Sequence, residues 1–158
     1  MIGTLFAAFF ASHLIGDYFL QTPHQAAHKG CDAKHGTDGD HIECDASGSR
    51  AACVGHVVTH TLITALFVIV AVWADGLDVS PTSVTVGLTL SGLTHYAIDR
   101  RPNLRRFADM IGKGEFYRLG DPRPDRDDNL TLGTGWHYMD QAAHVATIFA
   151  IAVIMVLI

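Results

Sequence analysis

Charged residues are scarce in this sequence and unevenly placed. Lys, Arg, Asp and Glu make up 17% of the 158 residues, well below the roughly 25% of ordinary soluble proteins, whereas hydrophobic residues make up 49%. The charges gather in residues 22–50 and 99–128 and leave long apolar runs between them. This pattern excludes a typical soluble domain and predicts a membrane protein whose helices are joined by polar loops.

Cysteine and basic residues are also few. Three cysteines are an odd number and exclude a disulfide framework. No Lys or Arg precedes residue 29, and His13 and Asp17 interrupt the first apolar run. We therefore expect this run to be a membrane span rather than a secretory signal peptide, which has a basic beginning. The net charge of −5 is modest and gives no indication of nucleic-acid binding.

Four apolar runs come near the length of about 20 residues that a helix needs to cross a hydrocarbon core. They occupy about residues 2–20, 51–74, 82–99 and 136–158. The third run is the shortest and is rich in Thr and Ser, but its Gly87 and Gly92 suit close helix packing in a bilayer. The sequence therefore predicts one all-α domain over residues 1–158, an integral-membrane antiparallel four-helix bundle.

Two polar connections are predicted to lie on one face of this bundle. Residues 21–50 form a Cys- and His-rich loop, which we expect to be solvated because its spacings match no standard zinc finger, although a zinc site is the alternative. Residues 103–118 carry apolar residues at helical spacing among basic ones. That pattern predicts a short amphipathic helix at the membrane surface or, alternatively, an ordinary surface helix.

Each apolar run carries a pair of polar residues four positions apart. Residues at i and i+4 share one face of a helix, and ionisable groups inside a membrane are candidates for function. The pairs end runs one and three but begin runs two and four, so an antiparallel bundle brings all four toward one membrane face. At about 1.5 Å per residue, each pair lies within roughly 5–15 Å of that face. The four pairs are His13 and Asp17, His56 and His60, His95 and Asp99, and Asp140 and His144.

These eight side chains are predicted to form one cluster that binds metal. Imidazole and carboxylate groups suit Zn²⁺, Mn²⁺ or Fe²⁺, and bundle proteins build di-metal centres from such groups on facing helices. We therefore expect one or two divalent ions. Two alternatives remain at this point: a network of His–Asp hydrogen bonds that only specifies the bundle, and a path for protons or ions.

The chemistry of such a cluster favours a metal-dependent hydrolase acting on a lipid-linked or phosphate-bearing substrate. Asp17 or Asp140 would serve as general base, and Arg100 and Arg101 would hold an anionic lipid headgroup. One alternative is a metal-ion or proton transporter, for which only Thr85, Thr89 and Ser91 continue a polar path beyond the pairs. Another is a non-enzymatic membrane protein of a phage or its host, with the cluster purely structural.

Four motifs resemble a known family. They are HLIGDYFLQ at residues 13–21, HYAIDRR at 95–101, GKGEFY at 112–117, and LGTG at 132–135 followed by DQAAH at 140–144. The sequence resembles, over nearly its whole length except about residues 31–49, an uncharacterised family of small membrane proteins from bacteria and actinobacterial phages. The resemblance implies a four-helix protein of the bacterial inner or plasma membrane. A looser similarity links the layout of the pairs to membrane-embedded metal-dependent hydrolases.

The distribution of basic residues predicts the orientation of the bundle. Those near the spans all lie on the side of the polar pairs, and the opposite side has none. Because cytoplasmic loops carry an excess of Lys and Arg, we expect the cluster near the cytoplasmic face and both termini outside. The basic residues are Lys29, Lys34, Arg50, Arg100, Arg101, Arg105 and Arg106.

This topology can be tested with reporter fusions. Reporters placed after Ile158 and within residues 76–80 are expected to be active on the outer side of the membrane, and a reporter within residues 31–44 on the cytoplasmic side. A reporter after Ile158 that is active only in the cytoplasm would contradict the topology.

Overall fold

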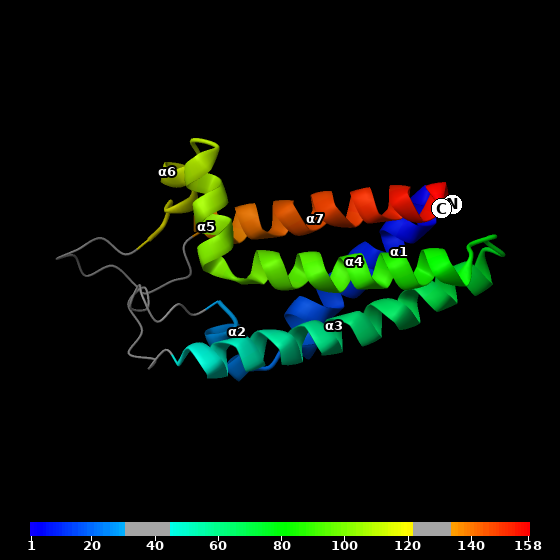
Figure 1. Ribbon diagram of the computed structural model, residues 1–158, viewed down its shortest axis with the longest axis horizontal. Coiled ribbons are helices and arrows are strands. Elements are labelled where there is room, and N and C mark those ends of the chain that lie inside the picture. Colours follow the sequence, from blue (N-terminus) through cyan, green and yellow to red (C-terminus); the bar gives the residue numbers. More distant parts are fainter. Residues whose placement is uncertain (31–44, 122–133) are drawn as a thin grey trace.

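The computed structural model describes residues 1–30, 45–121 and 134–158 of the chain. All regular elements within these ranges are helical, which confirms the all-α prediction. Four long helices lie alongside one another (Figure 1): α1 (Ile2–Ile15), α3 (Ala46–Ala74), α4 (Pro81–Asp99) and α7 (Thr134–Leu157). The short elements are the π-helix η1 (Gly16–Leu20), α2 (Pro23–His28), α5 (Arg101–Met110) and α6 (Gly114–Tyr117).

The long helices form an antiparallel bundle. Helix α1 packs against α3 and α7, and α4 packs against the same two helices. Both termini lie at one end of the bundle, whereas α5 and α6 lie at the other end, where α4 finishes and α7 begins (Figure 1). The arrangement brings the end of α1 to the same level as the start of α3, as the sequence pattern predicts.

Three of the helical segments are long and apolar enough to cross a membrane: Ile2–Leu20, Ala46–Ala74 and Gly135–Leu157. The fourth predicted span, residues 82–99, belongs to α4, which has 19 residues but is not among these three segments. Its Thr, Ser and Gly residues lower its hydropathy, and their small size suits a helix enclosed by protein neighbours. The structure thus supports a membrane location through three helices.

Helix boundaries follow local signals in the sequence. Thr22 and Gln25 form a reciprocal capping box at the start of α2, and the Asp45 carboxylate accepts hydrogen bonds from two backbone N–H groups at the start of α3. Ser80 caps α4 just before Pro81, a residue that suits the first helical position. The caps at Asp45 and Ser80 fix where the long helices α3 and α4 begin.

Two predicted connections differ from the observed elements. The predicted loop 21–50 contains the short helix α2 and the first residues of α3. The predicted helix 103–118 is two helices, because α5 ends at a turn in which Gly112 adopts φ +73° and Lys113 N–H donates to the Ala108 carbonyl. Glycine adopts this left-handed conformation without steric cost, so it ends the helix there.

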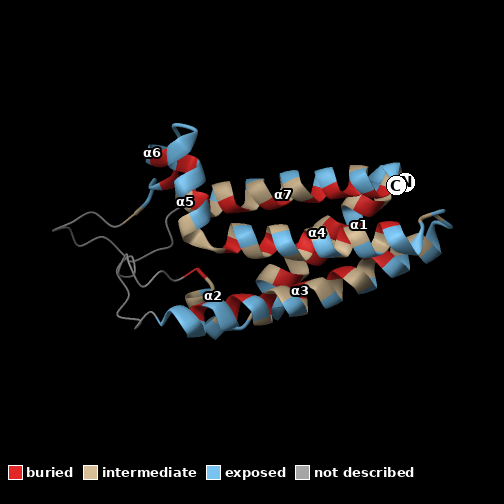
Figure 2. Cartoon of the chain, in the orientation of Figure 1, coloured by how far each residue is buried: buried red, intermediate tan, exposed pale blue. Residues whose placement is uncertain are grey.

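The distribution of buried and exposed residues is opposite to that of a soluble bundle. Buried stripes along α3 and α4 carry histidines, serines and an aspartate, while the outward faces are apolar (Figure 2). Leu62 is 68% exposed, Leu93 64% and Phe149 55%. Such apolar surfaces are costly in water and are suited to contact with lipid tails.

The interior divides into two layers along the bundle. The end with the termini is filled by apolar side chains, including Leu5, Phe9, Val68, Ile151 and Met155. The polar pairs lie toward the end that carries α5 and α6. There Leu104, Ala108 and Tyr117 form a smaller apolar cluster that seats α5 and α6 against α7.

Gly87 allows α4 to approach α7 closely, and its replacement should weaken the bundle. A Cβ atom at residue 87 would lie 2.3 Å from Sδ of the buried Met155. We expect Gly87→Val to lower the stability by about 1–3 kcal/mol through overpacking, measured as a lower melting temperature in detergent. Gly3→Val is the control, because a Cβ at Gly3 meets nothing within 4 Å. Equal melting temperatures for both variants would contradict this packing.

Candidate metal centre

The structure brings all eight residues of the predicted pairs together. Each offers a ligand atom to at least one group in which the ligand atoms lie within 4.8 Å of one another. Their side chains are at most 11% exposed. The three groups are His13, Asp17, His60 and His95; Asp17, His56, His95 and Asp99; and Asp99, Asp140 and His144.

Four atoms of the second group lie close to one another. His56 Nε2 lies 2.9 Å from His95 Nε2, and Asp17 Oδ1 lies 3.2 Å and 3.4 Å from these two nitrogens. Asp99 Oδ2 lies 3.4 Å from His56 Nε2 and 3.3 Å from His95 Nε2. We refer to these four residues as the tetrahedral group.

These distances match tetrahedral coordination of a metal. Zinc binds nitrogen and carboxylate oxygen at about 2.0–2.1 Å, so the edges of its ligand tetrahedron are about 3.3–3.4 Å. The four N–O distances in the tetrahedral group fall between 3.2 and 3.4 Å. Charge-assisted N–H···O bonds are shorter, at about 2.7–2.9 Å. The His56–His95 separation of 2.9 Å and the His56–Asp17 separation of 3.2 Å also have the lengths of hydrogen bonds.

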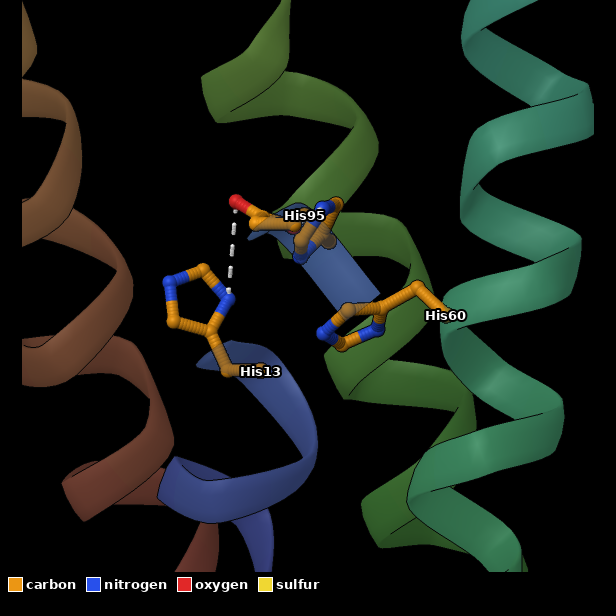
Figure 3. A group of neighbouring side chains, drawn as sticks. His13, His60 and His95 are labelled. Atoms are coloured by element: carbon orange, nitrogen blue, oxygen red, sulfur yellow. Dashed lines mark ion pairs between the residues drawn. The ribbon is translucent and has the colours of Figure 1, made fainter. Parts of the chain in front are cut away.

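His60 lies beside this group with no hydrogen-bond partner. Its side chain is 1% exposed, and neither ring nitrogen has a hydrogen-bond partner among the described residues. Its ring centroid lies 3.8 Å from that of His95, with the rings tilted by 34°, and 5.7 Å from that of His13 in an edge-on arrangement. The three rings approach one another from α3, α4 and α1 (Figure 3). Burying an imidazole without a partner costs free energy. A network of hydrogen bonds among these side chains therefore does not account for the burial of His60.

The end of the first span is shaped to fit the cluster. Asp17 lies on η1, where the chain widens from an α-helix to a π-helix, a change often seen at functional sites. Asp17 Oδ2 lies 3.8 Å from His13 Nδ1, one turn earlier. Gly16 provides room for the ring behind it, because a Cβ there would lie 2.8 Å from His60 Cδ2.

A lysine lies against the third group. In the sequence this residue, Lys29, served only to predict the orientation of the bundle in the membrane. Lys29 Nζ lies 2.9 Å from Asp99 Oδ1, and the lysine side chain is 16% exposed. Although burial lowers the pKa of Lys29, the nearby carboxylates of Asp99 and Asp17 raise it more, so the pKa lies above its usual value. His144 Nε2 is 3.6 Å from the same Asp99 oxygen and 3.8 Å from Asp140 Oδ2.

Gln141 and the two predicted arginines complete the surroundings. Gln141 Oε1 lies 3.2 Å from His13 Nε2, and its amide nitrogen donates to Asp140; it was not predicted as a site residue. Arg100 Nη1 donates to the Lys29 carbonyl and to the Ser49 hydroxyl. The Arg101 guanidinium lies over the Trp136 ring at 4.6 Å. Their predicted contact with an anionic headgroup stays a prediction.

The histidines of the predicted loop are only partly within the described residues. His28 Nδ1 lies 2.8 Å from the His24 carbonyl oxygen, and the two rings stack at 4.2 Å on α2. Neither residue belongs to the three ligand groups. His35 and His41, which we also expect outside the cluster, lie outside the described residues, as do Cys31 and Cys44.

The fold and the cluster define a class of protein: an all-helical protein with three helices of membrane-spanning length around buried groups of His and Asp that can hold a metal. The chain belongs to the family described as "Protein of unknown function (DUF3307)", whose profile matches residues 41–158. The predicted resemblance to an uncharacterised family is confirmed. His13 and Asp17 precede the matched residues. No curated protein and no solved structure significantly matches the chain.

Asp99 is the most connected carboxylate of the cluster, and removing its charge should destabilise the fold. It forms ion-pair contacts with Lys29, His56, His95 and His144. Because breaking a buried pair leaves the other charge uncompensated, we expect Asp99→Asn to cost about 3–5 kcal/mol. The measurement is the melting temperature in detergent.

Asp140→Asn is the matched control, because the only ion-pair contact of Asp140 among the described residues is His144 at 3.8 Å. Its melting temperature should fall less than that of Asp99→Asn. The reverse order would contradict the view that Asp99 holds the cluster together.

Proposed function

We propose that this protein is an integral membrane metalloprotein whose His/Asp cluster holds a divalent transition-metal ion near the cytoplasmic face, and that it acts as a hydrolase on a lipid-linked or phosphate-bearing substrate. The tetrahedral group carries the metal assignment. Two imidazole nitrogens and two carboxylate oxygens at 3.2–3.4 Å across the N–O edges have the spacing of a zinc ligand set. Mn²⁺ and Fe²⁺ also accept these ligand types.

In this proposal all four long helices cross the bilayer, which places the site near the cytoplasmic face. Helix α4 is short and moderately polar, but it packs on both α3 and α7 and presents its own apolar side chains, such as Leu93, outward. Lys29, Arg100, Arg101 and Arg105 lie at the end of the bundle opposite the termini. Under the positive-inside rule that end faces the cytoplasm and both termini lie outside. The exposed apolar and basic residues of α5 then rest at the lipid headgroups.

The residues around the tetrahedral group suit hydrolysis. A divalent ion held here would polarise a phosphoryl or acyl oxygen and lower the pKa of a bound water. Because the four side chains of the tetrahedral group already fill a tetrahedral site, that water would need a fifth position, to which a four-coordinate zinc can expand. His60 offers two ring nitrogens without hydrogen-bond partners among the described residues, next to the ligand His95. A proton from water can pass to His60, or to Asp140 on the other side of Asp99. Asp17 belongs to the ligand set, so Asp140 is the better of the two predicted bases.

The packing of the bundle weighs against the transporter alternative. A polar contact continues below the cluster from Ser12 Oγ to Thr64 Oγ1 at 3.1 Å. Beyond it, the interior consists of the apolar core that includes Leu5, Phe9 and Val68. Of the three residues predicted to continue a path, Thr85 and Thr89 are exposed and donate to carbonyls of their own helix, whereas Ser91 is buried. The apolar core among the described residues therefore weighs against a continuous polar path through the bundle.

Metal content tests the proposed centre. Protein purified without chelators or a histidine tag, and then offered Zn²⁺, is expected to hold stoichiometric metal by elemental mass spectrometry. His56→Ala should lose most of that metal because it removes a ligand, whereas His28→Ala, on α2, should keep it. Folded wild-type protein that retains no metal and takes up none would contradict the proposed function.

Hydrolysis requires a separate measurement. The zinc-loaded protein in detergent micelles is expected to release phosphate from a polyprenyl diphosphate or from phosphatidic acid. We expect His60→Ala to retain the metal of the tetrahedral group but lose at least about tenfold in rate, because it removes a proton acceptor that lies outside that group. A metal-loaded wild-type protein inactive on both lipid phosphates would count against the hydrolase and leave the metal centre standing.

A further inference from the structure

Lys29 places an ammonium group against a second set of candidate ligands. Its Nζ lies 2.9 Å from Asp99 Oδ1, whereas the tetrahedral group uses the other oxygen of Asp99, Oδ2. Asp99, Asp140 and His144 each offer one ligand atom, and these atoms lie within 4.8 Å of one another. A lysine ammonium is a compact single positive charge, and here it contacts an oxygen to which a second metal ion would bind.

The charges of the cluster balance with one divalent ion. Ionised Asp17, Asp99 and Asp140 contribute three negative charges, and Lys29 contributes one positive charge. The remaining two negative charges equal the charge of a single Zn²⁺. A second divalent ion would leave an excess of two positive charges in a buried site, where uncompensated charge is strongly unfavourable.

The backbone at Lys29 is held in place from three helices. The Lys29 carbonyl accepts a hydrogen bond from Arg100 Nη1, which also donates to Ser49 on α3. Gly30 is buried against the Arg101 side chain, where a Cβ would lie 2.5 Å from Arg101 Cγ. These contacts hold the lysine at the cluster, so its ammonium is a fixed part of the site.

We propose that Lys29 is a built-in cation that closes a second metal site made of Asp99, Asp140 and His144, so that the protein binds one divalent ion, and that the second site binds metal when the ammonium is removed. This inference rests on the proposed metal centre in the tetrahedral group. It identifies Lys29 as the residue that sets the number of metal ions.

The number of bound zinc ions tests the inference. Native mass spectrometry of the full chain in detergent with excess Zn²⁺ should show one ion in the wild type and two in Lys29→Met, which keeps the side-chain length and loses the charge. Lys29→Arg, which keeps the charge, should bind one ion. Lys113→Met, at an exposed lysine, is the matched control and should also bind one.

Two further variants separate the possible outcomes. The double variant Lys29→Met/Asp140→Asn should return to one ion, and Asp140→Asn alone should keep the resident ion. Wild-type protein with two ions, Lys29→Met with one, or loss of the resident ion in Asp140→Asn would overturn the inference. Wild-type protein with no ion would instead overturn the proposed metal centre. If Lys29→Met does not fold, Lys29→Gln takes its place. The number of bound zinc ions in that variant, in the wild type and in Asp140→Asn then tests the inference.

Discussion

Burial of three carboxylates in an apolar bundle is the constraint on which this structure depends. Each loses its hydration, and only positive charge or several hydrogen bonds can compensate for that loss. The bundle provides one fixed cation, Lys29, at 2.9 Å from Asp99, and a ring of histidines whose nitrogens face the carboxylates at 3.2–3.8 Å. Those distances leave room for a metal ion between the groups, and the histidine that remains without a partner, His60, lies at the edge of that space.

The long helices are arranged around this polar layer. Their buried residues include His, Asp and Ser near α5 and are mainly Leu, Phe, Val and Met near the termini. The outer faces are largely apolar, although α4 also exposes Thr85 and Thr89, and Figure 2 shows exposed residues along the four long helices. An apolar exterior with a polar interior is the arrangement that a bilayer favours, because polar groups must find partners inside the protein. The apolar core at the terminal end then separates the cluster from that end of the bundle.

The residues that match the family include only part of the site. The matched residues 41–158 include six of the eight clustered side chains. The other two, His13 and Asp17, come from the first helix, and Asp17 supplies one of the four atoms of the tetrahedral group. The first helix is therefore part of the site and not an accessory to it. Its packing against α3 and α7 completes the ligand set.

The sequence by itself determined the helical class, the level of the four polar pairs and their convergence, because i, i+4 spacing and alternating helix direction are properties of the chain pattern. It combined α5 and α6 into one helix, since the effect of a left-handed Gly112 is local and small in a hydrophobic pattern. Its fourth span, α4, is not among the three helices that are apolar enough to cross a membrane by composition. Only the tertiary structure decided which of the eight groups face one another, placed Asp17 on a π-helix, left His60 without a partner and brought Lys29 to Asp99. Those outcomes depend on side-chain directions and on contacts between residues far apart in the sequence, 70 positions for Lys29 and Asp99 and 128 for His13 and Gln141, which no local pattern specifies.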